Sequence, residues 1–257
     1  PGSQVHHTKQ PGCKILKLLK YISDILGTPI GVEKLISQAE VITFEGRKAI
    51  KKVFTSEVGI IKWLPPTLLF RSVYPFTLDP RERFKRELNF FNLGASGKWS
   101  AFSTPKVFSV DESSLTLIRE YVEGDLIDYR KHVKLLAATL AEVHSKGYVL
   151  GDVKPTNFIV GEELYIIDAE QATQSSSNDH RAWDLLLTTF FMSYLLIWDL
   201  PTFKEVLKGF LKSYLDSGGK EEVIKQVTNI KLTSISLLMP LPHLVTLGKV
   251  LEELGIT

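Results

Sequence analysis

The hydrophobic pattern of this 257-residue chain changes its period about halfway along, and the change limits the folds that the chain can adopt. Short runs of β-branched and aromatic residues between polar breaks predict strands in the first half. These runs lie at 41–44, 49–54, 58–64 and 115–122. Apolar residues three or four apart predict a helix over 128–146 and mainly helices after Ala182. We therefore predict an α+β chain of two unequal lobes, with a small antiparallel β-rich N-lobe and a mainly helical C-lobe.

A helix with clear ends is predicted between the strands of the first half. Asp79 is a good N-cap, Pro80 suits the first helical position, and Gly94 would end the helix. The segment before the strands is expected to be an arm followed by an amphipathic helix. The expected boundaries are 1–32 for this segment, 33–122 for the N-lobe and 123–257 for the C-lobe.

Composition and charge exclude several classes of protein. The formal net charge is only +2, so no strong basic field indicates a nucleic-acid partner. The single cysteine, Cys13, excludes an internal disulfide and suits a reducing compartment. The most apolar run, 185–198, is shorter than the roughly 20 residues that span a bilayer. We therefore expect a cytoplasmic protein with no membrane partner.

The region 150–168 carries polar residues suited to phosphoryl transfer. That reaction needs one carboxylate beside the attacking hydroxyl, and a second carboxylate and an amide oxygen for the metal ions that bridge the phosphates. We predict Asp152 and Lys154 as catalytic residues, and Asn157 and Asp168 as the ligands of Mg²⁺, which prefers hard oxygen donors. Because Asp and Asn also favour turns, loop formation alone is the alternative.

These residues resemble the catalytic and metal-binding loops of protein kinases. The pattern Asp-x-Lys-Pro-x-Asn begins at Asp152 after an apolar strand, and a second apolar strand ends in Asp168. The resemblance implies a bilobal protein-kinase-like fold with ATP and Mg²⁺ as cofactors. It also implies a hinge between the lobes at 118–124, where backbone groups near Glu120 and Val122 would bind adenine.

The same family has a phosphate-binding lysine on a strand and a glutamate partner on the next helix. Lys62 resembles that lysine and Glu87 its partner, which makes both of them cofactor-binding residues of the predicted site. Lys51 is the alternative lysine, and Lys62 is preferred because its separation from Glu87 is closer to that usual in the family. The alternative for Glu87 is an ordinary surface pair with Arg83 at helical spacing.

Several departures from typical kinases indicate an atypical member. The glycine-rich phosphate loop is missing, and Asp-Ala-Glu at 168–170 replaces Asp-Phe-Gly. Asp184 follows Asp168 by only sixteen positions, which leaves a short activation segment. These features resemble the small kinase subunit of the KEOPS tRNA-modifying complex and, next, the RIO kinases. The stretches that carry the likeness to KEOPS are 37–40, 78–87, 179–185 and 203–214.

The resemblance implies an atypical serine/threonine protein kinase or ATPase that depends on ATP and Mg²⁺. It also implies a protein substrate or partner subunit, and tRNA reached through a partner complex. A basic run would then face RNA, with a solvated helix face as the alternative. This run consists of Arg81, Arg83, Lys85 and Arg86. Two other functions stay open: the stretch 168–172 resembles sugar and aminoglycoside kinases, which act on small molecules, and the missing glycine-rich loop suits a nucleotide-binding pseudokinase scaffold.

Overall fold

The computed structural model describes residues 39–55 and 57–256. The predicted arm and amphipathic helix at 1–32 lie outside these residues, and so does the first half of the 37–40 stretch. Among the helices of the described part, none combines the length and the apolar character needed to cross a membrane.

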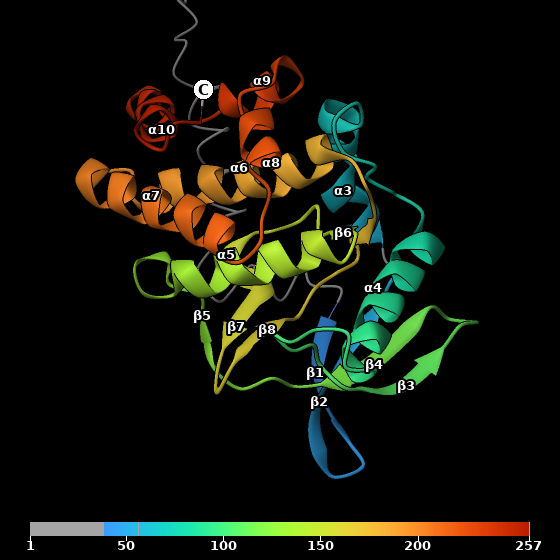
Figure 1. The fold of residues 1–257 in the computed structure, drawn as a ribbon. Helices are drawn as coiled ribbons and strands as arrows, with labels where there is room; N and C mark the ends of the chain where they lie inside the picture. Colours follow the sequence, from blue (N-terminus) through green and yellow to red (C-terminus); the bar gives the residue numbers. More distant parts are fainter. Residues whose placement is uncertain (1–38, 56, 257) are drawn as a thin grey trace, which may run out of the picture. The chain divides into compact units, whose positions relative to one another are not determined.

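The first part of the described chain forms a four-stranded antiparallel sheet (Figure 1). Its strands, in spatial order, are β1 (Ala39–Phe44), β2 (Arg47–Val53), β4 (Thr116–Glu120) and β3 (Val107–Asp111). β1 and β2 are joined by Glu45 and Gly46, whose φ angles of 49° and 75° suit a tight hairpin turn. The predicted antiparallel sheet of the N-lobe is therefore confirmed, with β3 as an additional strand.

Helix α4 (Pro80–Ala95) contacts β3 and β4, and its bounds are close to those predicted (Figure 1). The Asp79 side chain accepts a hydrogen bond from the backbone N–H of Arg81, as expected of an N-cap. The buried side of α4 carries phenylalanines and also two charged residues, Arg83 and Glu87. Charged groups are rarely buried without partners, so these two residues point to a polar site beneath the helix.

The prediction of a third strand at 58–64 is wrong, because the segment belongs to helix α3 (Glu57–Phe70). Its β-branched residues favour a strand, and the prolines at 65–66 were expected to end it. α3 instead continues through both prolines, although proline cannot donate the backbone hydrogen bond of a helix. A contact with a distant part of the chain outweighs this local cost. Trp63 is 4% exposed, and its Nε1 donates to Glu170 Oε1 at 2.7 Å.

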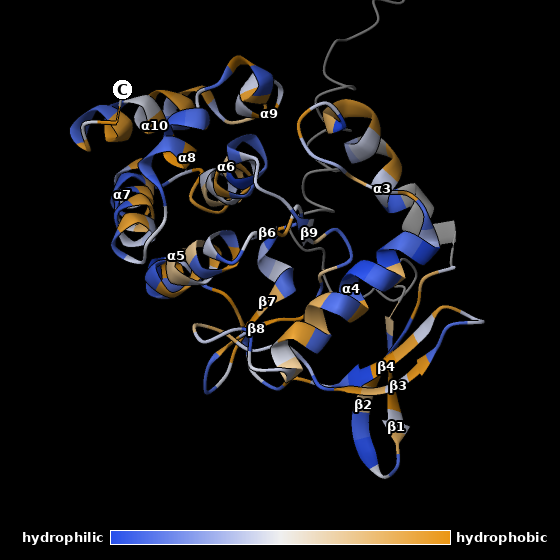
Figure 2. Ribbon diagram, turned by 45° about the vertical axis from the view of Figure 1, so that its right-hand side comes forward, coloured by the Kyte–Doolittle hydropathy of each residue, from blue (hydrophilic) through white to orange (hydrophobic). Residues whose placement is uncertain are grey.

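The last part of the described chain is mainly helical, as predicted. Its helices are α5 (Tyr129–Ser145), α6 (Asn178–Leu195), α7 (Leu200–Asp216), α8 (Glu221–Gln226), α9 (Thr233–Ser236) and α10 (Leu241–Glu253). α7 contacts both α5 and α10, and α6 contacts α8 (Figure 1). Hydrophilic and hydrophobic segments alternate along α7 (Figure 2), and its buried residues recur three or four apart from Phe203 to Tyr214. α7 therefore buries one apolar face against its neighbours, whereas α6 is buried on nearly all sides.

Short strands before and after α5 carry the region predicted for catalysis. β5 (Asp125–Leu126), β7 (Phe158–Val160) and β8 (Leu164–Ile166) form one sheet, and β6 (Tyr148–Val149) pairs with β9 (Thr173–Gln174). A short 3₁₀ helix, Pro155–Asn157, separates β6 from β7. Ser103 links the first part of the chain to this sheet, because its N–H donates to the carbonyl of Leu164 at 2.8 Å. The arrangement is the predicted bilobal, protein-kinase-like α+β fold.

Candidate functional site

The backbone of the predicted catalytic loop is held by Asp184, a fully buried residue of α6. Its carboxylate accepts hydrogen bonds from the backbone N–H groups of Leu150 and Gly151, each at 2.8 Å. The same carboxylate lies 3.2 Å from Nε2 of His144 on α5, so two helices fix one turn of the loop. A buried acceptor with several donors leaves the loop little freedom to move.

Gly151 is required at the point where this loop turns. Its φ angle is +74°, in the left-handed region that favours glycine. A Cβ atom at this position would lie 2.3 Å from the ring of Tyr74, which is fully buried. The carbonyl of Gly151 also accepts a hydrogen bond from Nε1 of Trp183 at 2.9 Å. Packing and backbone conformation therefore explain why glycine precedes Asp152.

Three of the predicted site residues come together in the loop itself. Lys154 Nζ lies 2.8 Å from Asp152 Oδ2, and Nδ2 of Asn157 donates to the Asp152 carbonyl at 2.9 Å. Asn157 is 2% exposed, and its carbonyl accepts from the N–H of Ile167 at 2.9 Å. Because Ile167 precedes Asp168, this bond ties the catalytic loop to the segment that carries the second predicted carboxylate.

The lysine that pairs with Glu87 is Lys52, which the sequence analysis did not select. Lys52 is on β2, is 5% exposed, and its Nζ lies 2.6 Å from Glu87 Oε2. The predicted pairing of Lys62 with Glu87 is wrong, because Lys62 is on α3 and its Nζ lies 2.6 Å from Glu170 Oε1 instead. The alternative prediction, in which Lys51 is the strand lysine, is also wrong. Lys51 and Lys52 are adjacent on β2, so their side chains point to opposite faces. Lys51 pairs with Glu40 at 3.3 Å, and its side chain is 39% exposed.

Lys52 also connects Glu87 to the predicted metal ligand. Its Nζ lies 3.1 Å from Asp168 Oδ1. Glu87 Oε2 in turn accepts a hydrogen bond from the backbone N–H of Ala169 at 3.2 Å. The glutamate of α4 therefore contacts both the strand lysine and the backbone next to Asp168, which places β2, α4 and the segment after β8 around one point.

Charge on these groups follows from burial and from the lysines around them. Burial alone would raise the pKa of Asp168, but attraction to Lys52, Lys62 and Lys154 holds it well below its ordinary value. Asp168 is therefore an ionised carboxylate. Burial raises the pKa of Glu87 to about 7, and the attraction of Lys52 offsets this only in part. Repulsion from the carboxylates of Asp168 and Glu170 also raises the pKa of Glu87.

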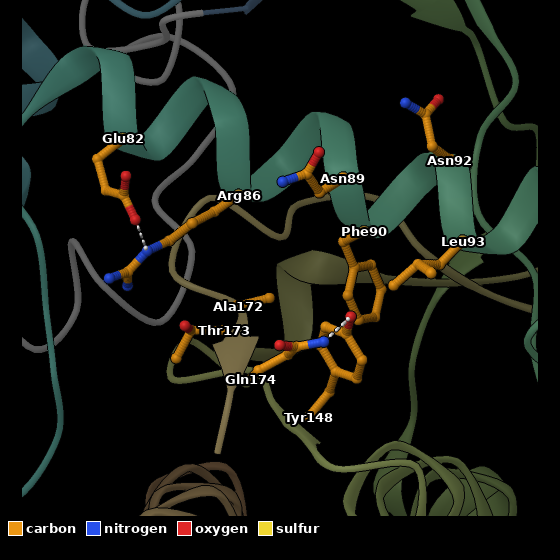
Figure 3. Close-up of a pocket in the computed structure, with 10 residues that line it drawn as sticks. All are labelled: Glu82, Arg86, Asn89, Phe90, Asn92, Leu93, Tyr148, Ala172, Thr173 and Gln174. Atoms are coloured by element: carbon orange, nitrogen blue, oxygen red, sulfur yellow. Dashed lines mark hydrogen bonds and ion pairs between the residues drawn. The ribbon is translucent and has the colours of Figure 1, made fainter.

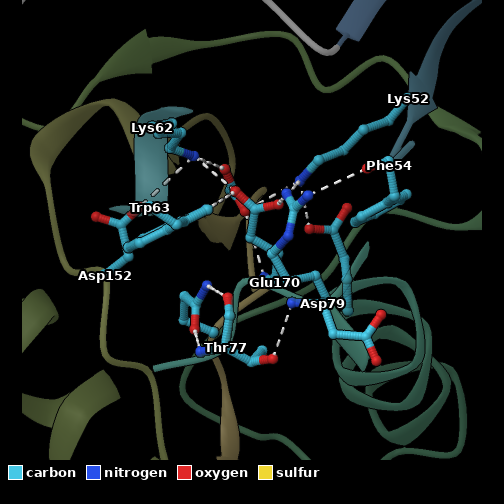
Figure 4. A network of polar contacts seen from close by, with 12 residues as sticks. Lys52, Phe54, Lys62, Trp63, Thr77, Asp79, Asp152 and Glu170 are labelled. Atoms are coloured by element: carbon cyan, nitrogen blue, oxygen red, sulfur yellow. Dashed lines mark hydrogen bonds and ion pairs between the residues drawn. The ribbon is translucent and has the colours of Figure 1, made fainter. Parts of the chain in front are cut away.

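Glu170 lies in the centre of the polar network, although the sequence analysis did not predict it as a site residue (Figure 4). It is 1% exposed. Its Oε1 accepts from Lys62 Nζ at 2.6 Å and from Trp63 Nε1 at 2.7 Å, and its Oε2 accepts from Arg83 Nη1 at 2.9 Å. Burial alone would raise the pKa of Glu170, but the neighbouring lysines lower it to about 2. The signal that could have revealed it is an acidic residue two positions after Asp168, where typical kinases have glycine.

The predicted basic run is not one exposed face of α4. Arg83 is fully buried and pairs with Glu170, so the alternative of an ordinary surface pair between Arg83 and the helix glutamate is wrong. The side chain of Arg86 is only 14% exposed and lies 3.0 Å from Glu82. Of the four basic residues, Arg81 and Lys85 are the exposed ones. The run therefore divides between the interior and the surface.

In the predicted hinge, Glu120 and Val122 differ in what their backbones contact. The N–H of Glu120 donates to the Lys106 carbonyl at 2.8 Å, and its carbonyl accepts from Arg119 Nη1 at 3.1 Å. Val122 follows the end of β4, and its backbone forms no hydrogen bond with the other described residues. Val122 is therefore the better candidate for a backbone hydrogen bond to adenine.

The residues present fit Mg²⁺ held together with substrate phosphates. Nδ2 of Asn157 donates a hydrogen bond to the Asp152 carbonyl, which leaves the amide oxygen of Asn157 as the atom suited to a metal. Asp168 adds an ionised carboxylate. Within residues 39–55 and 57–256, no group of three or more His, Cys, Asp or Glu residues could hold a metal ion by itself. One carboxylate and one amide oxygen are a donor set that Mg²⁺ takes when phosphates supply further oxygens.

A hollow of about 490 Å³ lies against α4, apart from these residues (Figure 3). Its lining residues come from α4, β6, β9 and the residue before β9, and Gln174 Nε2 donates to Tyr148 Oη at 2.8 Å within it. None of the predicted site residues lines it. The hollow is therefore not the predicted phosphoryl-transfer site.

Proteins of several archaea have sequences similar to this chain. The KEOPS complex subunit Bud32 of Pyrococcus abyssi is 26% identical over 164 residues, which cover 58% of this chain and 74% of that protein. A probable serine/threonine-protein kinase BUD32 homolog of Archaeoglobus fulgidus is 26% identical over 159 residues, which cover 60% and 78%. A probable bifunctional tRNA threonylcarbamoyladenosine biosynthesis protein of Thermoplasma acidophilum is 23% identical over 171 residues, which cover 64% of this chain but only 30% of that protein.

No family model matches the chain. Among solved structures, the streptomycin–ATP–APH(2'')-IIa ternary complex has a TM-score of 0.44 and 13% identity, over 95% of this chain and 97% of that chain. The sequence relatives confirm the resemblance that the catalytic-loop motif and the short activation segment predicted. The chain is similar to an archaeal KEOPS complex subunit and to a probable archaeal serine/threonine-protein kinase.

Proposed function

We propose that this chain is an ATP- and Mg²⁺-dependent phosphotransferase, an atypical serine/threonine kinase or ATPase. One observation carries the proposal. Asp168 lies beside the Lys52–Glu87 pair, and the Asp152–Lys154 pair lies in the loop tied to the same segment. Phosphoryl transfer depends mainly on positioning and on neutralisation of charge, and these groups supply both. Similarity to Bud32 proteins supports the same class.

On the nucleotide side, Lys52 binds the α- and β-phosphates. Glu87 holds its ammonium group at 2.6 Å and, through the N–H of Ala169, keeps it in position relative to Asp168. The backbone of Val122 contacts the adenine. This assignment replaces Lys62 by Lys52 as the phosphate-binding lysine and keeps Glu87 as its partner.

On the acceptor side, Asp152 orients the attacking hydroxyl or water and accepts its proton. Lys154, 2.8 Å from Asp152, places positive charge beside the transferred phosphoryl group. Asp168 and Asn157 hold Mg²⁺, which neutralises charge on the phosphate oxygens when it is bound. Asp184 and Gly151 keep the loop backbone in the conformation that presents Asp152.

Partners follow from the similarity to KEOPS subunits. We place the chain in the cytoplasm beside a partner subunit, with tRNA reached through that complex and with a protein hydroxyl or water as the phosphate acceptor. The names of the relatives, a KEOPS complex subunit and a tRNA threonylcarbamoyladenosine biosynthesis protein, support this placement.

Incubation of purified protein with γ-labelled ATP and Mg²⁺ tests the proposal, with released phosphate and labelled protein followed separately. We expect turnover that is lost in Asp152→Ala and in Asp168→Ala. It should be kept in Asp216→Ala, which changes an exposed aspartate at the end of α7. The ratio of free phosphate to labelled protein separates ATPase from kinase. Failure of the wild-type protein to bind ATP would contradict the proposal, and ATP binding without turnover would favour a pseudokinase scaffold.

A further inference from the structure

Helix α3 places one of its side chains inside the acidic part of the candidate site (Figure 4). The ammonium nitrogen of Lys62 lies 2.6 Å from Glu170 Oε1, 3.6 Å from Asp168 Oδ2 and 4.0 Å from Asp152 Oδ2. It therefore faces the proposed metal ligand and the proposed catalytic carboxylate at the same time. The Lys62 side chain is 31% exposed, so solvent reaches it.

Both oxygens of the Asp168 carboxylate face lysines. Oδ1 lies 3.1 Å from Lys52 Nζ, and Oδ2 lies 3.6 Å from Lys62 Nζ. Mg²⁺ needs a carboxylate oxygen at about 2.0–2.1 Å and a near-octahedral shell of other oxygens around it. Because like charges repel, Lys62 in its observed position competes with a metal ion for Asp168 Oδ2.

Glu170 holds α3 in this position. Two consecutive residues of α3, Lys62 and Trp63, bind its Oε1, and a buried arginine of α4 binds its Oε2. Trp63 also stacks on Phe76, with 5.7 Å between the ring centroids. Glu170 follows Asp168 by two positions, so the segment that supplies the metal ligand also supplies the attachment point of α3.

We propose that α3 is a built-in cover of the catalytic site. In the nucleotide-free chain, Lys62 takes the place of the divalent cation between Asp152 and Asp168, and its salt bridge to Glu170 holds it there. Binding of Mg²⁺ with nucleotide requires Lys62 to leave this position. The inference rests on the proposed function, in which Asp168 binds Mg²⁺. It gives Lys62 an inhibitory role in place of the predicted phosphate-binding role.

Binding of Mn²⁺ together with a non-hydrolysable ATP analogue, followed by electron paramagnetic resonance of free Mn²⁺, tests the cover. Lys62→Met should bind Mn²⁺ roughly fivefold or more tightly than wild type, because no side-chain cation competes for the site. Lys51→Met removes a lysine that pairs with Glu40 away from the site, and it should bind like wild type. Thermal unfolding of each variant checks that it is folded.

A second variant, Trp63→Phe, separates a cover from simple loss of charge. It keeps Lys62 but loses the hydrogen bond from residue 63 to Glu170, so Glu170 holds α3 less firmly. Mn²⁺ should therefore bind more tightly than in wild type, but by a smaller factor than in Lys62→Met. In wild type, tryptophan emission should change when Mg²⁺ and the analogue bind, because Trp63 leaves its place on Phe76. This change should be smaller in Trp63→Phe, which keeps the other three tryptophans.

The outcomes are distinct. Unchanged Mn²⁺ binding by Lys62→Met would overturn the cover, and weaker binding would overturn it and make Lys62 a phosphate ligand. If neither wild type nor Lys62→Met binds the analogue, the proposed function itself fails. If both bind it equally well, the function stands and the cover alone is excluded.

Discussion

The two sides of the candidate site are held together by different kinds of contact. On the catalytic-loop side, Asp184 accepts hydrogen bonds from two backbone N–H groups, and Trp183 donates one to the carbonyl of Gly151. On the metal side, Asp168 and Glu170 contact charged side chains from β2, α3 and α4, and Glu170 also accepts a hydrogen bond from Trp63. The first arrangement fixes a backbone, whereas the second balances charge.

This difference indicates how each side responds to nucleotide. Hydrogen bonds that fix a backbone need not change when phosphates bind, but a network of charges must rearrange when new charges come into a buried site. Buried ion pairs also add little net stability, because the cost of desolvation offsets their attraction. We infer that the loop side mainly stabilises the fold and that the metal side mainly binds nucleotide. Variants on the two sides can test this division.

Lys52→Met should have the largest effect, and it acts on the metal side. It removes the ammonium group between Glu87 and Asp168. Loss of one preorganised group that stabilises charge typically lowers the rate by roughly 100- to 1,000-fold. Stability should suffer less than turnover, because burial already raises the pKa of Glu87 to about 7 and the glutamate can take up a proton instead. Turnover of γ-labelled ATP and the unfolding midpoint in urea measure the two effects.

The neighbouring lysine is the matched control for this variant. Lys51→Met changes the same residue type one position away, on the exposed face of β2, and should keep wild-type turnover. Equal losses in the two variants, or full turnover in Lys52→Met, would show that Lys52 is not the phosphate-binding lysine.

Asp184→Asn should have the next largest effect, on the loop side. An amide at this position cannot accept from both Leu150 and Gly151 as the carboxylate does. The substitution leaves two buried donors without an acceptor, one backbone N–H and the amide N–H that faces it. At about 1–3 kcal/mol for each, we expect roughly 2–6 kcal/mol of lost unfolding free energy. Urea unfolding measures the change. Asp179→Asn on the same helix, where the aspartate pairs with Lys231 near the surface, should cost less than about 1 kcal/mol. Similar losses of unfolding free energy in both variants would show that the hydrogen bonds of Asp184 to the loop backbone do not stabilise the fold more than a surface ion pair does.

The loop side could be predicted from the sequence because its parts are close along the chain. Asp152, Lys154 and Asn157 lie within six residues, and their spacing and types were sufficient to select them as candidates. Helix α4 was predictable for a similar reason, since Asp79 marks its start through a contact two residues away. In both cases the signal and the structure that it specifies are local.

On the metal side, Asp168 and Glu87 were selected from the sequence, but the lysine contacts and Glu170 could not be predicted, because these contacts join distant parts of the chain. Lys62 meets Glu170 across 108 positions, and this contact holds α3 as a helix against its strand-like composition. Lys51 and Lys52 are adjacent, and only the packing of β2 against α4 decides which of them is buried. The one local signal was Phe54, which lies two positions after Lys52 and so on the same face.

Gly151→Ala tests whether the loop side depends on close packing as well as on hydrogen bonds. The substitution strains a residue with φ of +74° and puts a methyl group 2.3 Å from the buried ring of Tyr74. We expect a loss of roughly 2–4 kcal/mol in unfolding free energy. Gly218→Ala is the control, because its φ is +88° but nothing lies within 4 Å of the added methyl group. It should cost about 1 kcal/mol. If the two variants lose the same stability, the contact with Tyr74 contributes nothing.

Glu142→Gln should have the smallest effect. It tests whether a carboxylate near the surface holds a backbone segment through N–H hydrogen bonds, as Asp184 does. Glu142 of α5 accepts from the backbone N–H groups of Ser100 and Ala101, at 2.8 Å and 2.7 Å, and from Lys146 at 2.5 Å. Burial alone would raise the pKa of Glu142, but these hydrogen bonds lower it from 4.5 to about 2. A lowered pKa means that the stabilisation is complete above about pH 4.5 and is lost as the pH falls towards 2.

The stability difference between wild type and Glu142→Gln should therefore depend on pH. At pH 6 we expect wild type to be more stable by roughly 1–2 kcal/mol, since hydrogen bonds to a charged acceptor are stronger than those to an amide. The difference should shrink as the pH falls from 4.5 to 2, because the glutamate is then protonated. Urea unfolding at pH 6, 4 and 3 measures it. A difference that stays constant with pH would mean that the charge of Glu142 is not what joins α5 to the Ser100–Ala101 turn, and the likeness to Asp184 would be one of position alone.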